Sequence, residues 1–221
     1  MGWSDGTILI NIGAIIYIIA FAVRGELTLR LLTLVGNGFY IAYYLLVPEV
    51  TLWIAIGSTV LMTIANVFVM ARIALERTTW GMTEADKALY SQFDNFNPGQ
   101  FRRLAKLATR LAGEQDAPLT TEGEPPDRLY FITGGTVQVA KGHDSFTLST
   151  NNFIGEVAWL LNGPASAKVT STADSEILVW DSAALRRLCD KSPDIDNALR
   201  ARINRDMAVK LSGSVMRAEA A

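Results

Sequence analysis

Charged residues are distributed very unevenly along this chain, and that distribution constrains its fold more than any other feature. Residues 1–71 contain five Asp, Glu, Lys and Arg residues, whereas residues 72–221 contain 37. Three stretches of the first third contain none: residues 7–23, 31–47 and 50–71. A helix that crosses a membrane needs about 20 mostly apolar residues, with a lower limit near 17. The sequence therefore predicts three transmembrane helices followed by a soluble domain.

Two other structures could account for apolar stretches of this length. Buried helices of a soluble protein ordinarily keep a polar face, and these three stretches have almost none. A cleaved signal peptide would carry Lys or Arg before its apolar region, whereas residues 1–6 contain Asp5 and no cation. The pattern favours an integral protein of the plasma or inner membrane over both alternatives.

The arginines beside the apolar stretches predict the orientation of the chain. Arg24 and Arg30 lie between the first two stretches, and Arg72 and Arg77 follow the third, whereas the loop at Pro48-Glu49 contains no cation. Because Lys and Arg collect in cytoplasmic loops, we expect the N-terminus outside and the C-terminal domain in the cytoplasm.

Each apolar stretch also contains one asparagine: Asn11, Asn37 or Asn66. An amide in hydrocarbon needs a partner, so we expect these side chains to face neighbouring helices. An ion or substrate path would more naturally contain ionisable residues, and the three stretches have none. A channel subunit is disfavoured as well, because no pore helix or selectivity loop is visible.

The pattern of the remaining sequence changes from helical to strand-like and back. Apolar spacing predicts a helix over residues 100–113, ended by Gly113. Alternating residues predict strands over 128–132, 136–140, 146–149, 168–172 and 176–180, with Gly134-Gly135 as a hairpin turn between the first two. Helices are predicted over 182–189 and from Pro193 to about Leu211. The fold class is thus a membrane α-helical region followed by an α+β domain, a small β-roll or jelly roll flanked by helices.

These expectations divide the chain into four parts. Residues 1–72 form the three-helix transmembrane region, and residues 73–99 form a juxtamembrane helix and connector. Residues 100–212 form the folded domain, and residues 213–221 form a tail.

The composition argues against catalysis and against several kinds of partner. One cysteine and one histidine exclude a disulfide framework and a Cys/His zinc cluster. No Walker loop or Gly-x-Ser-x-Gly motif is present, and the net charge of −2 gives no reason to expect a nucleic-acid partner. We expect no enzymatic activity, metal or cofactor, an exposed turn at His143 and a packed thiol at Cys189.

The predicted last helix has an apolar residue at every fourth position. The members of this stripe are Ile195, Leu199, Ile203, Met207 and Leu211. Such a stripe can cover the domain's own core or pair with a second copy of itself. We expect a homodimer that uses it.

Two segments resemble the phosphate-binding cassette of cyclic-nucleotide-binding domains. They are Gly155-Glu156-Val157-Ala158 and, after a short spacer, Pro164-Ala165-Ser166-Ala167-Lys168. Residues 127–139 also resemble the preceding hairpin of that family. The resemblance implies cyclic AMP as ligand, with cyclic GMP as the alternative, and a Glu156 carboxylate that accepts from the ribose hydroxyl. Small residues would let backbone amides approach the phosphate.

The cassette departs from the family at one important position. Ala165 stands where ordinary members place an arginine that pairs with the phosphate. Losing a charge-assisted contact costs a few kcal/mol, roughly, unless another group replaces it. Lys168 is the candidate replacement within the segment, although strand alternation would place it on the opposite side from Ala165.

The whole chain resembles the Popeye-domain family, in which three membrane helices precede a cyclic-nucleotide-like domain. Ala167-Lys168-Val169-Thr170 and residues 204–211 are similar to segments of that family, but its Asp-Ser-Pro-Glu motif is absent. The resemblance implies a membrane-anchored cyclic-nucleotide sensor that acts on an unidentified membrane or cytoplasmic protein. The alternative is a membrane scaffold whose nucleotide fold has lost its ligand.

Overall fold

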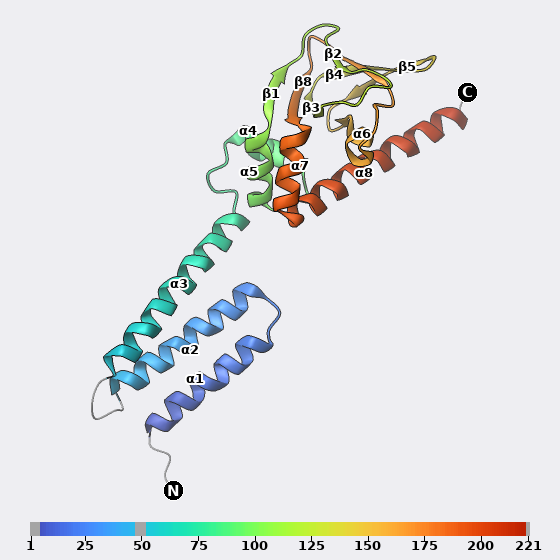
Figure 1. The fold of residues 1–221 in the computed structure, drawn as a ribbon. Coiled ribbons are helices and arrows are strands. Elements are labelled where there is room, and N and C mark those ends of the chain that lie inside the picture. The colour runs from blue at the N-terminus through green and yellow to red at the C-terminus, as the bar shows by residue number, and fades with distance from the viewer. Residues whose placement is uncertain (1–4, 47–51, 220–221) are drawn as a thin grey trace. The chain divides into compact units, whose positions relative to one another are not determined.

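The computed structural model describes residues 5–46 and 52–219 (Figure 1). The chain divides into two compact units, Met1–Thr78 and Thr79–Ala221. The predicted loop at Pro48-Glu49 lies outside the described residues, as do residues 1–4 and the last two residues of the predicted tail.

The first unit consists of three helices. They are α1 (Asp5–Ala22), α2 (Glu26–Leu46) and α3 (Trp53–Arg77). Helices α2 and α3 are long and apolar enough to cross a membrane, whereas the apolar part of α1, Thr7–Ala22, is shorter. Only 11% and 6% of the apolar windows of α2 and α3 are buried, unlike the core helices of a soluble protein. The structure thus has two candidate spans where the sequence predicted three.

All three asparagines were predicted to face neighbouring helices, and the side chains of Asn37 and Asn66 join helices in the structure. The side chain of Asn37 accepts from the Tyr17 hydroxyl, and its Nδ2 donates to Thr63 Oγ1 at 2.8 Å. Asn66 Nδ2 donates to the carbonyl of Arg30 at 3.0 Å, and Arg30 Nη1 donates to Asn66 Oδ1 at 3.2 Å. Polar residues therefore connect α2 to both of its neighbours.

The second unit is built on two four-stranded antiparallel sheets. Helices α4 (Glu84–Tyr90) and α5 (Pro98–Leu107) precede them. The first sheet has the order β1 (Thr109–Ala112), β8 (Glu176–Asp181), β3 (Arg128–Gly134), β6 (Phe153–Ile154). The second has the order β2 (Pro118–Thr120), β7 (Lys168–Ser171), β4 (Thr136–Lys141), β5 (Asp144–Ser149). The remaining helices are α6 (Glu156–Leu161), α7 (Ser182–Lys191) and α8 (Pro193–Glu219). The predicted β-roll flanked by helices is confirmed.

Two apolar clusters hold this unit together. The inner faces of the two sheets enclose the smaller cluster, which includes Ile132, Val139 and Ile177. The larger cluster joins the outer face of the first sheet to α4, α5, α7 and α8. Trp180, 1% exposed, belongs to it and donates from Nε1 to the carbonyl of Leu104 at 2.9 Å. The helices α4, α5, α7 and α8 therefore pack on the outer face of the first sheet.

The predicted helix over residues 100–113 is wrong in its last part. Helix α5 ends at Leu107, because Ala108 is extended and Thr109–Ala112 pair with β8 as strand β1. Gly113 does not stop a helix. A Cβ there would lie 1.9 Å from Ser175 Oγ and 2.3 Å from the carbonyl of Thr172, so only glycine fits against that turn.

The predicted hairpin at Gly134-Gly135 is also wrong, although both strands exist. Strands β3 and β4 belong to different sheets. Gly135 has a φ of +65°, and a Cβ on it would lie 2.2 Å from the carbonyl of Asp174. This crowded turn carries the chain from one sheet to the other. A sequence pattern of two strands joined by glycines does not distinguish such a corner from a hairpin.

The apolar stripe of α8 packs on its own domain. Ile195, Leu199 and Ile203 are at most 1% exposed within the larger cluster, whereas Leu211 is 66% exposed. Three of the five stripe residues therefore cover the domain's own core, and the homodimer stays a prediction. The helix also continues to Glu219, beyond its predicted end.

Candidate functional site

The first cassette segment follows β6 and begins α6. Gly155 has a φ of +79°, and a Cβ on it would lie 3.3 Å from the carbonyl of Arg128 and 3.8 Å from Thr120 Cγ2. Glycine is required at this position by backbone conformation and by the neighbouring strand. Ala158 is buried and Val157 half-buried, so a larger side chain at Ala158 has little room.

Glu156 is held by a lysine that sequence reasoning did not assign to the site. Its side chain is 11% exposed, and Lys210 Nζ from α8 lies 2.8 Å from its Oε1. Lys210 also pairs with Asp206 Oδ2 at 2.7 Å and donates to the carbonyl of Phe153. The spacing of Asp206 and Lys210, four residues apart on one helix, was visible in the sequence, but nothing there linked them to Glu156.

The second cassette segment is fixed by its main chain to the loop between β2 and β3. The amide of Ala165 donates to the carbonyl of Glu124 at 2.8 Å, and the amide of Gly123 donates to the carbonyl of Ala165 at 2.9 Å. Pro164 and Ser166 are exposed, whereas Ala165 is 6% exposed. Among the described residues, the amides of Ser166 and Ala167 donate no backbone hydrogen bond.

Thr120 lies against both segments. Its methyl group borders Gly155, as noted above, and its hydroxyl donates to the carbonyl of Ala167 at 3.0 Å. Thr120 is 5% exposed and was not among the predicted site residues. The structure thus brings both segments close to one threonine side chain.

Lys168 does not take the place of the missing arginine. It begins β7 as an exposed residue, and the next residue, Val169, is buried at 4% exposure. Successive side chains of a strand point to opposite faces, so Lys168 lies on the outer face of its sheet. The nearest cation to the cassette carboxylate is therefore Lys210.

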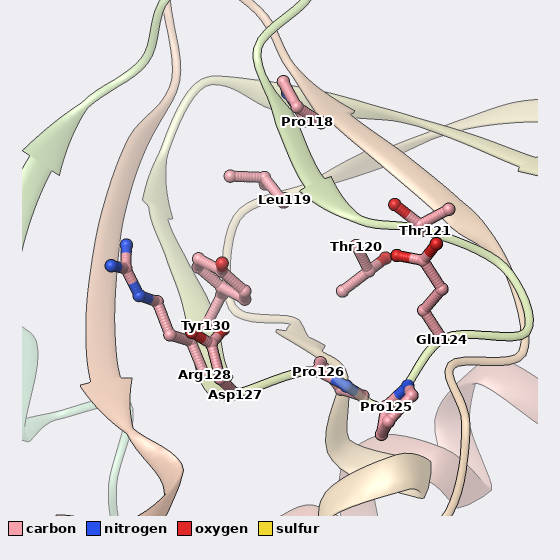
Figure 2. Close-up of a pocket in the computed structure, with 10 residues that line it drawn as sticks. All are labelled: Pro118, Leu119, Thr120, Thr121, Glu124, Pro125, Pro126, Asp127, Arg128 and Tyr130. Atoms are coloured by element: carbon pink, nitrogen blue, oxygen red, sulfur yellow. The ribbon is translucent and has the colours of Figure 1, made fainter.

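A cleft of about 290 Å³ lies between the end of β2 and the start of β3 (Figure 2). None of the predicted site residues lines it, although two of its lining residues, Thr120 and Pro126, border Gly155. Figure 2 shows the Glu124 side chain directed toward Thr121, and Arg128 directed to the opposite side. A second cleft, of about 420 Å³, lies beside α8 around Arg202 and also contains no predicted site residue.

Comparison with known proteins agrees with this arrangement. Residues 113–192 match the family model of the cyclic nucleotide-binding domain. A cyclic nucleotide-binding domain from Methylobacillus flagellatus superposes with a TM-score of 0.52 at 24% identity, covering 62% of this chain and 85% of that one. The C-terminal unit has the fold of a cyclic nucleotide-binding domain.

Bacterial potassium channels are among the relatives that share part of this sequence. A cyclic nucleotide-gated potassium channel of Mesorhizobium japonicum is 34% identical over 108 residues, 49% of this chain and 30% of the channel. A second such channel, of Rhizobium etli, is 31% identical over 84 residues, 38% of this chain and 24% of the channel. The chain thus spans less than a third of the length of either channel, and it shares only that part with them.

Two residues of the cyclic nucleotide-binding domain that could suggest other chemistry are structural. Cys189 is a buried thiol, as predicted, and desolvation, with Asp196 as the next cause, raises its pKa to about 12. A thiol with such a pKa is a poor nucleophile at neutral pH. His143 is exposed in the turn between β4 and β5, also as predicted.

Proposed function

We propose that this chain is a membrane-anchored, non-catalytic sensor of cyclic nucleotides, with cyclic AMP as its first ligand and cyclic GMP as the alternative. The observation that carries the proposal is the convergence of Gly155–Ala158 and Pro164–Lys168 on Thr120. All of these residues lie within the region that matches the family model. Fold alone would not suffice, because function depends on the site.

The ligand would be held by main-chain and carboxylate contacts. The amides of Ala158, Ser166 and Ala167 would meet the phosphate, since those of Ser166 and Ala167 lack backbone partners among the described residues. Glu156 would accept from the ribose hydroxyl through the carboxylate oxygen that Lys210 does not contact. Lys210 then acts by fixing the place of this carboxylate.

The membrane part of the proposal rests on the apolar helices α1, α2 and α3. We propose that all three span the bilayer with the N-terminus outside and the C-terminal domain in the cytoplasm, because Arg24, Arg30, Arg72 and Arg77 would then all face the cytoplasm. Three spans before a cyclic-nucleotide domain would give this chain the organisation of Popeye-domain proteins. The output would pass to a membrane or cytoplasmic partner protein.

One observation favours a second function, that of a membrane scaffold that no longer binds a nucleotide. Ala165 supplies no charge to a phosphate, and the part of the chain around it is acidic. Residues 109–181 contain ten Asp and Glu against four Lys and Arg, so their field opposes an anionic ligand. The two proposed functions differ in whether the domain still has affinity for a cyclic nucleotide.

Calorimetric titration of the full chain in lipid nanodiscs separates them. We expect saturable binding of cyclic AMP, weaker binding of cyclic GMP, and a roughly tenfold loss of affinity in Glu156→Gln, the effect of weakening one charged hydrogen bond. Glu122→Gln, which changes an exposed carboxylate in the β2–β3 loop, is the matched control and should bind as the wild type does. Absence of binding by the wild type to either nucleotide would establish the scaffold instead.

A further inference from the structure

The helices and the strands of the cyclic nucleotide-binding domain carry opposite charge. Helices α5 and α7 contain six Lys and Arg and one Asp, whereas residues 109–181, which form the roll, contain ten Asp and Glu and four Lys and Arg. The two helices contact each other and lie side by side at the end of the domain away from the strands (Figure 1). The domain therefore has a basic helical end and an acidic roll.

Most of the positive charge at the helical end is accessible. Arg103, Lys106, Arg187 and Lys191 are all exposed, and we call them the basic face. Acidic groups on the neighbouring helices include Asp86 of α4, Asp190 of α7, and Asp194 and Asp196 of α8. Asp196 is paired with Arg200 at 2.8 Å. Asp86 is paired with Arg110 at 2.8 Å, and Asp194 accepts from Gln100 at 2.9 Å. The basic face thus keeps a net positive charge after its neighbours are counted.

A large aromatic side chain lies beside this face. Trp80 is 77% exposed, and Arg102 of α5 donates to its carbonyl at 2.6 Å, which connects its backbone to α5. Only Thr78 and Thr79 separate Trp80 from the last residue of α3. Tryptophan prefers the boundary between water and hydrocarbon, where its ring and its N–H group are both accommodated.

We propose that the basic face and Trp80 bind the anionic lipid headgroups of the cytoplasmic leaflet, which orients the domain on the membrane. This inference rests on the membrane anchoring proposed above. The negative surface potential of that leaflet attracts Lys and Arg side chains within about one Debye length, and it repels the acidic roll. The cassette carboxylate belongs to the repelled part, so docking leaves the nucleotide site facing the cytoplasm.

Fluorescence of Trp80 in nanodiscs tests the contact. The full chain is reconstituted in phosphatidylcholine alone, or with phosphatidylglycerol, each carrying brominated acyl chains as quenchers. The difference between the wild type and Trp80→Phe isolates the signal of Trp80. We expect quenching of that signal in the anionic discs, little in the neutral discs, and reversal by high salt. Quenching that is absent from both, or equal in both, would overturn the proposal.

Charge reversal identifies the surface. Lys106→Glu should lower the ratio of docked to undocked domain by roughly tenfold, and Lys191→Glu added to it should lower the ratio further. Lys141→Glu makes the same change at the exposed end of strand β4 of the roll and is the matched control. An equal effect of Lys106→Glu and Lys141→Glu would overturn the proposal in favour of a nonspecific charge effect.

The same samples distinguish a failure of the proposed membrane anchoring from a failure of the proposed docking surface. Trp53 is 72% exposed on α3 and should be quenched in every disc if that helix crosses the bilayer. Loss of Trp53 quenching would refute the membrane anchoring. If Trp53 is quenched and Trp80 is not, only the proposed docking surface is refuted. Binding of an acidic protein, instead of lipid, to the basic face would also refute it.

Discussion

The two segments of the cassette are anchored in different ways. Gly155–Ala158 is held by the Glu156 side chain, which is paired with Lys210 on α8, and by the close fit of the Gly155 backbone against β3. Pro164–Lys168 is held through its main chain, by two hydrogen bonds between Ala165 and the β2–β3 loop and by one from the Thr120 hydroxyl to the carbonyl of Ala167. The first segment therefore has its charged side chain, Glu156, in place. The second segment is held in a defined path, but alanine stands at position 165, where an arginine was expected.

This difference shows that the path of a segment and the charge that it carries can be set independently. Backbone hydrogen bonds such as those of Ala165 with Gly123 and Glu124 do not depend on the side chain, so an arginine can be replaced without changing the path of the segment. Glu156, by contrast, is buried beside Lys210, and the loss of Lys210 would leave the carboxylates of Glu156 and Asp206 without their shared cation. The first segment should therefore be more sensitive to mutation than the second.

The largest effect is expected from Lys210→Met. This change leaves the carboxylates of Glu156 and Asp206, 11% and 3% exposed, without their shared cation. Breaking a buried ion pair by removing one partner costs about 3 kcal/mol or more. We expect a loss of that order in the free energy of unfolding, measured by urea titration of the full chain in detergent micelles.

Two further variants make this result specific. Lys168→Met removes an exposed lysine of the second segment and should change the free energy of unfolding by less than about 0.5 kcal/mol. Glu156→Gln combined with Lys210→Met should recover part of the loss, because one of the stranded charges is gone. If the two lysine variants are equally stable, the first segment is not held by its ion pair.

A pair of glycine substitutions compares the backbones of the two segments. Gly155→Ala should destabilise the domain by about 1–2 kcal/mol, because a non-glycine residue is strained at its φ of +79°. Gly163→Ala, just before the second segment, meets nothing within 4 Å and should be nearly neutral. Thermal unfolding of the two variants side by side measures the difference, and equal midpoints would contradict the strain at Gly155.

A smaller effect is expected from restoring the cation to the second segment. Ala165→Arg should strengthen the binding of cyclic AMP by roughly tenfold, or about 1.4 kcal/mol, since a guanidinium is placed where the phosphate is expected and Glu124 is adjacent to orient it. Lys168→Ala should leave the affinity unchanged, because that side chain lies on the outer face. Calorimetry of both variants decides whether the second segment retains the shape of a phosphate site.

The sequence alone predicted the elements of this fold better than their connections. Alternating residues located five of the eight strands, β3, β4, β5, β7 and β8, but not β1, β2 or β6. The corner at Gly135 was mistaken for a hairpin, because its cause is a contact with Asp174, distant in sequence. Thr109–Ala112 was assigned to a helix, since its apolar spacing fits both structures and only pairing with β8 decides between them.

The site was predicted only as far as its residues are contiguous in the chain. The cassette segments were visible as motifs, whereas Thr120 and Lys210 come from β2 and α8 and carry no local signal of their role. The apolar stripe of α8 was visible too, but a stripe does not show whether it covers its own core or a partner. Such questions depend on tertiary packing, which a local pattern does not contain.

Hydrogen exchange of single amides, in the full chain in nanodiscs with and without saturating cyclic AMP, tests the central claim most directly. The account predicts that the nucleotide slows exchange at Ala158, Ser166 and Ala167, which would donate to the phosphate, and changes little at Ala165, which is already bonded to Glu124. Unchanged exchange at these three amides, or protection confined to the cleft beside Arg202, would contradict it.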